Sequence, residues 1–262
     1  MSPPSLLERA NASTIDVFSF LLKGLARPRI ERWPEATALS CESPSVSAHR
    51  VLVTDTPSDP GALIRRAQGF FGDGIPWMLM ASSHLKDVMG PAVEANGMVA
   101  GRDDPGMLLE PIPSRPAGSS TVTVRHVTTL EGLQDFQDVA AGIFFPMSTL
   151  KRMFPSIPDR EGSGEGGPQL FVCYDNGKPV ATSMLLVSLG LGGIFFVGTR
   201  EEARKRGYGT AATWAAVLAA RQEGCDACFL TASDVGLPIY ERMGFRKVLK
   251  YLQWHTPGPK DG

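Results

Sequence analysis

Cysteine is scarce in this chain, and neither sign of charge dominates it. Four cysteines among 262 residues are too few for a disulfide scaffold and suit a reducing compartment. The 26 Lys and Arg side chains nearly balance the 27 Asp and Glu, and the sequence lacks the basic stripe typical of nucleic-acid binders. The first residues also lack the basic and apolar segments of a secretory signal. These absences predict a cytoplasmic protein that does not bind nucleic acid.

Long hydrophobic runs are also missing, apart from one uncharged stretch at residues 180–199. Its length of about 20 residues is what a membrane helix needs, but four glycines interrupt it. Two strands at about 180–187 and 194–197, joined by a glycine-rich turn, explain the pattern better. We therefore expect no contact with a membrane.

A metal site is not expected either. Cys225 and Cys228 have a spacing seen in zinc sites, but a structural zinc ion needs four ligands. The remaining cysteines, Cys41 and Cys173, come from distant parts of the chain, and the four histidines form no metal-binding motif. A reduced cysteine pair at the start of a strand is the simpler interpretation.

The composition changes near residue 120. Thirteen of the 21 prolines lie within residues 1–120, and residues 111–120 are rich in Pro, Gly and Ser, as linkers are. We therefore predict two parts, residues 1–118 and residues 119–262. In the first part the pattern predicts helices at about 14–25, 60–71 and 85–94, with strands at about 38–41, 49–54, 77–80 and 107–109.

The second part has an α/β pattern in which hairpin strands precede a crossover helix. Thr128 and Glu131 have capping-box spacing and predict a helix from there to about 144. The tripeptide Asp175-Asn-Gly177 predicts a hairpin turn. Further elements are expected as strands at about 121–127, 171–174, 227–232 and 246–254 and as helices at about 147–153, 209–223 and 237–243.

A basic, glycine-containing loop follows the second strand of the uncharged stretch. Gly207 and Gly209 lead into the long helix directly after Arg204, Lys205 and Arg206. Glycines let backbone N–H groups approach a ligand, and a helix start offers unpaired donors with partial positive charge. Together these features suit a pyrophosphate. The alternative from these residues alone is a glycine turn beside a solvated basic loop.

A dinucleotide-binding fold competes for the same residues, because 207–212 fits G-x-G-x-x-A and Asp234 follows. However, about nine residues separate Val197 from Gly207, whereas that fingerprint follows its strand directly. Too few residues follow Asp234 to complete a doubly wound sheet.

The loop and the sequence after it resemble a known family. Arg204-Lys-Arg-Gly207-Tyr-Gly209 is similar to the R/Q-x-x-G-x-G/A acyl-CoA motif of the GNAT superfamily of N-acetyltransferases. The run 230–245, with Tyr240 before a Gly-Phe pair, resembles the family's second half. The resemblance covers about residues 122–254. It implies an α/β GNAT fold, a mixed, mostly antiparallel sheet flanked by helices. Residues 1–118 resemble the degenerate GNAT-like N-terminal lobe of tandem members, and 119–262 the catalytic domain.

The resemblance assigns roles residue by residue. The general acid that protonates the departing thiolate falls at Tyr240, and Ser233 stands where many members contact the pantetheine arm; both are predicted to be catalytic. The strand edge that pairs with the pantetheine amides falls at Phe196, Val197, Gly198 and Thr199. The pyrophosphate loop falls at Arg204, Lys205, Arg206, Gly207, Tyr208, Gly209 and Thr210.

One feature departs from the family pattern. Many members carry a glutamate, on the strand before the loop, that deprotonates the amine, but residues 194–199 contain no carboxylate. Glu161, Glu165 and Asp234 are alternatives, as are a water chain or an amine that arrives neutral. His126 ends a strand before a helix cap and is a further candidate to face the substrate.

The resemblance implies an N-acyltransferase that moves an acetyl group from acetyl-CoA to a primary amine by direct attack. We expect a small-molecule acceptor, because no acidic or basic groove is evident, and a monomer or homodimer. The alternatives are a non-catalytic acyl-CoA-binding or regulatory protein of the same fold and a protein or peptide N-acetyltransferase. The intact glycine loop and Tyr240 favour an enzyme, whereas the missing glutamate favours a binder.

Overall fold

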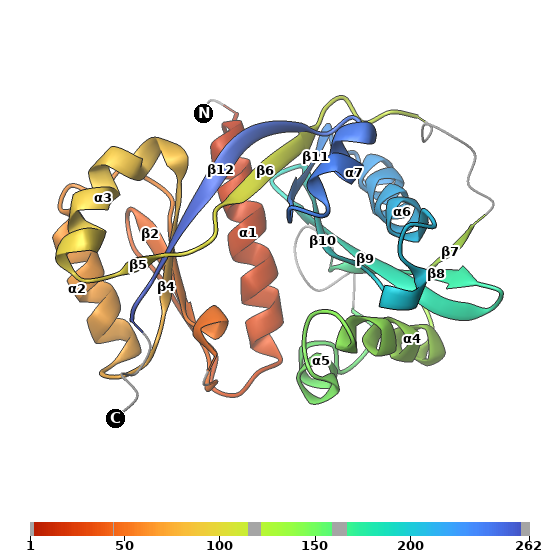
Figure 1. Ribbon diagram of the computed structural model, residues 1–262, viewed down its shortest axis with the longest axis horizontal. Coiled ribbons are helices and arrows are strands. Elements are labelled where there is room, and N and C mark those ends of the chain that lie inside the picture. Colours follow the sequence, from red (N-terminus) through yellow and green to blue (C-terminus); the bar gives the residue numbers. More distant parts are fainter. Residues whose placement is uncertain (1–2, 44, 115–121, 159–166, 258–262) are drawn as a thin grey trace. The chain divides into compact units, whose positions relative to one another are not determined.

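The computed structural model describes residues 3–43, 45–114, 122–158 and 167–257. The chain forms two compact units, which we call unit 1 (Met1–Val17 and Met107–Lys247) and unit 2 (Phe18–Gly106 and Val248–Gly262). In each unit helices flank strands (Figure 1). This confirms the predicted α/β class.

Unit 1 is built on a mixed sheet with the strand order β7-β8-β9-β10-β11-β6. Neighbours are antiparallel from β7 to β10, while β10 and β11 are parallel and joined by the crossover helix α6. The strands are β6 (Asp104–Leu109), β7 (Thr123–His126), β8 (Gln169–Asp175), β9 (Lys178–Ser188), β10 (Leu191–Thr199) and β11 (Ala227–Thr231). The helices are α4 (Leu130–Ala141), α5 (Met147–Met153), α6 (Tyr208–Gln222) and α7 (Leu237–Arg242), with a short 3-10 turn at Glu201–Ala203.

Unit 2 has a smaller sheet with the order β1-β2-β3-β4-β12, to which β5 adds on β12. Here β3 and β4 are the parallel pair, joined by the crossover helix α2. The strands are β1 (Arg29–Arg32), β2 (Ala36–Ser40), β3 (Arg50–Val53), β4 (Met78–Ser82), β5 (Val99–Ala100) and β12 (Arg246–His255). The helices are α2 (Pro60–Phe71) and α3 (Lys86–Ala95), with 3-10 turns at Val46–Ala48 and Ser83–Leu85.

The two units interleave along the chain, whereas the sequence analysis divides it at residue 118. Helix α1 (Leu6–Lys23) begins in unit 1, where the Arg9 guanidinium forms an ion pair with Asp226 and donates to the carbonyl oxygens of Leu189 and Gly190. The last strand, β12, pairs with β4 of unit 2. A degenerate lobe at 1–118 and a catalytic domain at 119–262 remain predictions.

The uncharged stretch at 180–199 forms two strands, as expected. The hairpin between β9 and β10 turns at Leu189 and Gly190, whose φ angles are 50° and 70°, and the hairpin between β8 and β9 turns at Asn176 and Gly177. Positive φ at both central residues is the twist that a two-residue hairpin requires. None of the helices in the described residues is both long and apolar enough to span a bilayer.

Most predicted elements are present, with shifted ends. Helix α2 and helix α5 have the predicted bounds, but α1 begins eight residues before the expected 14. The short strands β1 and β5 were not predicted, because both are short and every residue of both is exposed, so no alternation of buried and exposed positions marks them. The cap of α4 is Thr129, whose hydroxyl accepts the Gly132 N–H, so the prediction of Thr128 as the cap was wrong by one residue.

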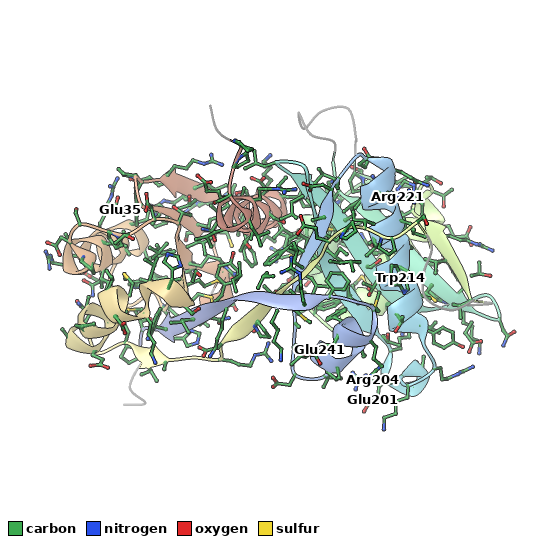
Figure 2. The ribbon with its side chains drawn as sticks, turned by 90° about the horizontal axis from the view of Figure 1, so that it is seen from above. Glu35, Glu201, Arg204, Trp214, Arg221 and Glu241 are labelled. Atoms are coloured by element: carbon green, nitrogen blue, oxygen red, sulfur yellow. The ribbon has the colours of Figure 1, made fainter. Side chains whose placement is uncertain are left out.

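Helix α6 packs closely on the sheet of unit 1. Its small residues allow this, since a Cβ atom added at Gly192 on β10 would come within 2.5 Å of the Ala220 Cβ. Trp214 of α6 lies in the core of unit 1 with Phe171 and Ile194, as expected from sequence. Figure 2 shows Glu201 and Arg204 beyond one end of this helix and Arg221 near the other. Close packing thus holds the start of α6 beside the end of β10.

Candidate functional site

The parallel strands β10 and β11 separate partway along their length. They pair only from Leu191 to Gly193 of β10, although β10 continues to Thr199. From Ile194 onward, the β10 edge that faces β11 is therefore released from this pairing. Unpaired strand-edge N–H and C=O groups are available to an extended ligand, in the manner of an added strand.

A β-bulge distorts β10 within the separated segment. Phe196 and Val197 together lie opposite the single residue Ser183 of β9, and Phe196 has a φ of 49°. The Thr182 hydroxyl donates to the Phe196 carbonyl oxygen at 2.9 Å, which fixes this turn of the backbone. A bulge re-aims the amides that follow it, here those of Val197 and Gly198.

The glycine loop, residues 204–210, places the start of α6 next to the end of β10, and no side chain caps this helix. Lys205 and Gly207 have φ angles of 63° and 84°, and Gly207 caps α6 without any side-chain hydrogen bond. The Ala211 N–H donates to the Gly207 carbonyl oxygen, so the preceding amides of the first turn lie beyond the helix's own hydrogen-bond ladder. Such a helix start attracts anions.

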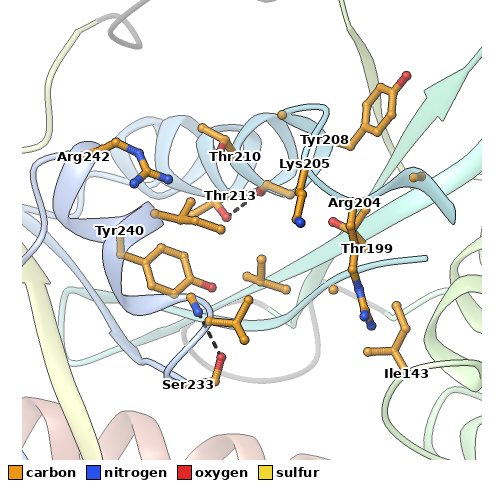
Figure 3. Close-up of a pocket in the computed structure, with 18 residues that line it drawn as sticks. Ile143, Thr199, Arg204, Lys205, Tyr208, Thr210, Thr213, Ser233, Tyr240 and Arg242 are labelled. Carbon is orange, nitrogen blue, oxygen red and sulfur yellow. Dashed lines mark hydrogen bonds between the residues drawn. The ribbon is translucent and has the colours of Figure 1, made fainter. Parts of the chain in front are cut away.

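A cavity of about 680 Å³ joins the separated strands to this helix start. Its charged wall residues are Arg204, Lys205 and Arg242, all cationic (Figure 3). The volume lies within the range of small-molecule and cofactor pockets. The remaining wall residues are Ile143, Val197, Gly198, Thr199, Ala203, Gly207, Tyr208, Gly209, Thr210, Thr213, Ser233, Val235, Gly236, Ile239 and Tyr240.

Tyr240 presents its hydroxyl to the cavity from α7 (Figure 3). Its ring is 8% exposed and packs edge-on against Phe245, with 5.8 Å between the ring centroids. Burial raises the pKa of Tyr240 to about 12. The phenol therefore keeps its proton at neutral pH, and its rigid ring leaves the O–H as a fixed donor.

Ser233 lies in the same wall, on the loop between β11 and α7. Its hydroxyl accepts the Gly236 N–H at 3.2 Å, a bond drawn in Figure 3. A Cβ atom added at Gly236 would lie 2.8 Å from Tyr240 Cε2. The turn that Ser233 closes thus holds the backbone against the ring of Tyr240.

Two residues of the predicted pyrophosphate loop, Arg206 and Tyr208, contact Asp175 at the end of β8. The Arg206 guanidinium lies 3.0 Å from Asp175 and 5.1 Å from the Tyr208 ring centroid. The Tyr208 hydroxyl donates to the Asp175 carboxylate. Burial, together with this hydrogen bond, raises the pKa of Tyr208. Figure 3 shows the Tyr208 side chain directed away from the other labelled residues. Asp175 therefore holds both residues beside Gly207.

The structure brings together most of the predicted site residues around the cavity. All of them line it except Phe196 and Arg206. Sequence reasoning missed Arg242 and Val235. Arg242 follows Tyr240 by two residues in the α7 sequence, and this proximity to a predicted catalytic residue was the available signal. Val235 is 78% exposed, which is unusual for a valine and consistent with a ligand-facing position.

The candidate bases that the structure describes do not line this wall. Asp234 and His126 do not line the cavity, and His126 instead packs against the Phe171 ring at 5.3 Å. Glu161 and Glu165 lie outside the described residues. The free cysteines Cys225 and Cys228 are buried, and the described part of the chain contains no cluster of three or more potential metal ligands.

Comparison with known proteins identifies the part of the chain that forms this cavity. Residues 134–245 match the model of the Acetyltransferase (GNAT) family. A search of curated proteins gave no match. The resemblance seen in the sequence is therefore confirmed for residues 134–245, which include every residue that lines the cavity.

Solved structures extend the likeness to nearly the whole chain. A GCN5-related N-acetyltransferase from Kribbella flavida has a TM-score of 0.72 and 19% identity, over 97% of both chains. A tandem GNAT protein from the clavulanic acid biosynthesis pathway has a TM-score of 0.60 and 13% identity, over 99% of both chains. A further GCN5-related N-acetyltransferase, from Sphaerobacter thermophilus, has a TM-score of 0.62 and 18% identity, over 86% of this chain and 78% of its own. These likenesses confirm the GNAT fold, including its tandem form.

Proposed function

We propose that this protein is an acetyl-CoA-dependent N-acetyltransferase that acetylates a primary amine of a small molecule. The observation that carries the proposal is the cavity itself, which has cations and an uncapped helix start at one end and the Tyr240 hydroxyl in its wall. A polyanionic coenzyme with a thioester matches this distribution of groups. In this proposal the protein works in the cytoplasm as a monomer or homodimer.

The coenzyme would bind mainly through backbone groups. The pyrophosphate would lie at the start of α6, against the amides of 208–210, with Arg204 and Lys205 beside it. The pantetheine arm would extend along β10 from Thr199 to Val197, where β11 has separated. Arg242 adds a third cation on α7, suited to a further phosphate of the coenzyme.

The reaction is a direct transfer. The amine lone pair attacks the thioester carbonyl carbon, and the amides after the bulge stabilise the oxyanion that forms. The carbon–sulfur bond then breaks, the sulfur takes the Tyr240 proton, and solvent later restores that proton. The raised pKa of Tyr240, about 12, means that the phenol donates only as negative charge develops on sulfur. The amine proton leaves to solvent or to a base outside the described wall.

Binding and turnover measured together test this proposal. Titration calorimetry with acetyl-CoA should give saturable binding to one site, and a thiol-release assay should show turnover with at least one amine of a chemically varied panel. The absence of acetyl-CoA binding in the folded protein would overturn the proposal. Binding without thiol release from any amine or peptide would support the non-catalytic acyl-CoA-binding alternative, which the lack of a carboxylate on β10 favours.

A further inference from the structure

Five phenylalanine rings gather on the side of β10 where the bulge lies. Phe196 is at their centre, and its ring centroid lies between 5.1 and 6.1 Å from those of four others. The four surrounding rings belong to α4 and to the segments that follow α4 and α5. They are Phe136, Phe144, Phe145 and Phe154.

This phenylalanine cluster has a buried floor and an open rim. Phe136 and Phe154 are completely buried and pack edge-on at 5.4 Å. In contrast, Phe144 is 37% exposed, and Phe145 and Phe196 are half-buried. Phenylalanine rings that serve only as core are normally covered. The open rim therefore offers aromatic surface that no described part of unit 1 covers.

The rim borders the cavity at Gly198. A Cβ atom added at Gly198 would lie 2.8 Å from Phe144 Cζ and 2.9 Å from Ile143 Cδ1, and both Gly198 and Ile143 line the cavity. Gly198 is also one of the residues whose amides follow the bulge. An acceptor that reaches the thioester from this side would touch the aromatic rim.

The charge of the cavity wall restricts the amine further. The charged residues of its described wall are Arg204, Lys205 and Arg242, and Tyr240 keeps its proton. The described wall contains no carboxylate or other proton acceptor, so a protonated amine finds no group there to take its proton. An amine that is uncharged at neutral pH avoids this penalty, because its lone pair is free when it arrives.

We propose that the acceptor is an aromatic amine, whose nitrogen is bonded directly to an apolar ring. Delocalisation of the lone pair into the ring keeps such an amine neutral at pH 7, and the ring packs edge-on or offset against Phe144, Phe145 and Phe196. This inference rests on the proposed function and narrows its substrate class. The attack of the neutral nitrogen forms the amide bond, and the nitrogen loses its proton to solvent as the thiolate departs.

Matched acceptors test the inference. Thiol release should be measured with 4-ethylaniline, with 4-ethylbenzylamine and with glucosamine, all with acetyl-CoA. We expect kcat/KM at pH 7 to be at least about tenfold higher for the aniline than for the benzylamine, since only the former is uncharged. The aniline value should stay flat between about pH 6 and pH 9, while the benzylamine value rises with pH.

Variants on the rim complete the experiment. Phe144→Ala should raise KM for the aniline by about tenfold, because ring contacts are lost, and leave the acetyl-CoA Kd unchanged. Leu130→Ala is the matched control, since Leu130 is 72% exposed on α4 and outside the cavity wall. Phe144→Leu keeps apolar volume, and should weaken the preference for the aniline over cyclohexylamine even if Phe144→Ala does not fold.

Two results would overturn the inference. Faster turnover of glucosamine than of the aniline, with normal acetyl-CoA binding, would reject the aromatic acceptor while leaving the acetyltransferase proposal intact. Equal effects of Phe144→Ala and Leu130→Ala on the aniline KM would reject the rim as its binding surface. Loss of acetyl-CoA binding itself would instead be a failure of the proposed function.

Discussion

The two units share a structural plan but differ where a coenzyme would bind. In both, an antiparallel strand leads into a parallel pair through one crossover helix, β3-α2-β4 in unit 2 and β10-α6-β11 in unit 1. In unit 2 the parallel pair stays in register along all of β3, from Arg50 to Val53. In unit 1 the pairing ends at Gly193. Only unit 1 therefore releases a strand edge.

The starts of the two crossover helices also differ, in whether a side chain caps the helix. Helix α2 is capped by its own carboxylate, since Asp59 Oδ1 accepts the Ala62 N–H at 2.8 Å. Helix α6 starts at Gly207 without a side-chain cap. At the start of α2 the Asp59 carboxylate already lies where an anion would bind, whereas the start of α6 leaves that place open. The difference supports the prediction that the degenerate lobe at 1–118, which contains most of unit 2, binds no coenzyme.

Removing one hydroxyl should give the largest contrast between the units. Tyr240→Phe in unit 1 should lower kcat by ~10²–10⁴, the usual contribution of positioned proton transfer, and leave the acetyl-CoA Kd nearly unchanged because the ring remains. Tyr251→Phe is the control, since Tyr251 is fully buried in unit 2 and should affect stability alone. Calorimetry and thiol release on both variants measure this, and an unchanged kcat for Tyr240→Phe would remove it from the mechanism.

A branched side chain at the second helical position should separate the two helix starts. A Cβ atom at Gly209 would lie 2.9 Å from Thr199 Oγ1, inside the cavity wall, so Gly209→Val should weaken acetyl-CoA binding by about tenfold or more. Gly61 has the corresponding place in α2, where its nearest neighbours are the flexible side chains of Arg65 and Asp59. Gly61→Val should leave Kd unchanged. Similar Kd values for both folded variants would contradict the placement of the pyrophosphate.

The cap of α2 should matter for stability and not for binding. Asp59→Ala removes the acceptor for the Ala62 N–H and should lower the free energy of unfolding by about 1 kcal/mol. The acetyl-CoA Kd should remain that of the parent protein. Denaturant unfolding and calorimetry check the two parts, and a weaker Kd would show that unit 2 contributes to the coenzyme site.

The smallest expected effect is on the pH dependence of stability. Burial raises the pKa of Tyr240 from 10.0 to about 12, so the folded state holds this proton more tightly than the unfolded state does. The resulting stabilisation is complete below pH 10 and is lost as the pH rises from 10 toward 12. Between about pH 9 and pH 11, the free energy of unfolding should fall less steeply for Tyr240→Phe than for the parent. Equal slopes for the two proteins would show that the Tyr240 phenol is exposed to water in the folded state.

Local pattern predicted the parts of the site that depend on neighbouring residues in sequence. The glycine loop, the turn at Asn176 and Gly177, and the start of α2 are short-range features with strong residue preferences. The separation of β10 from β11 and the bulge at Phe196 were not predicted, because they depend on which distant strands pair. The ion pair of Arg206 with Asp175 was also not predicted, because the loop cation lies 31 positions along the chain from its partner on another hairpin.

The crossing of the chain between the units has a consequence for how the protein is made. Residues of β4 leave the ribosome early, yet Ser82 pairs with Tyr251 and Met78 with His255 of β12. The sheet of unit 2 therefore cannot be completed until β12 is synthesised, long after the rest of that unit. Arg9 of helix α1 likewise cannot form its ion pair until Asp226 has been synthesised. Domains usually fold one after another during synthesis, but here unit 2 is completed last although most of it is made before most of unit 1.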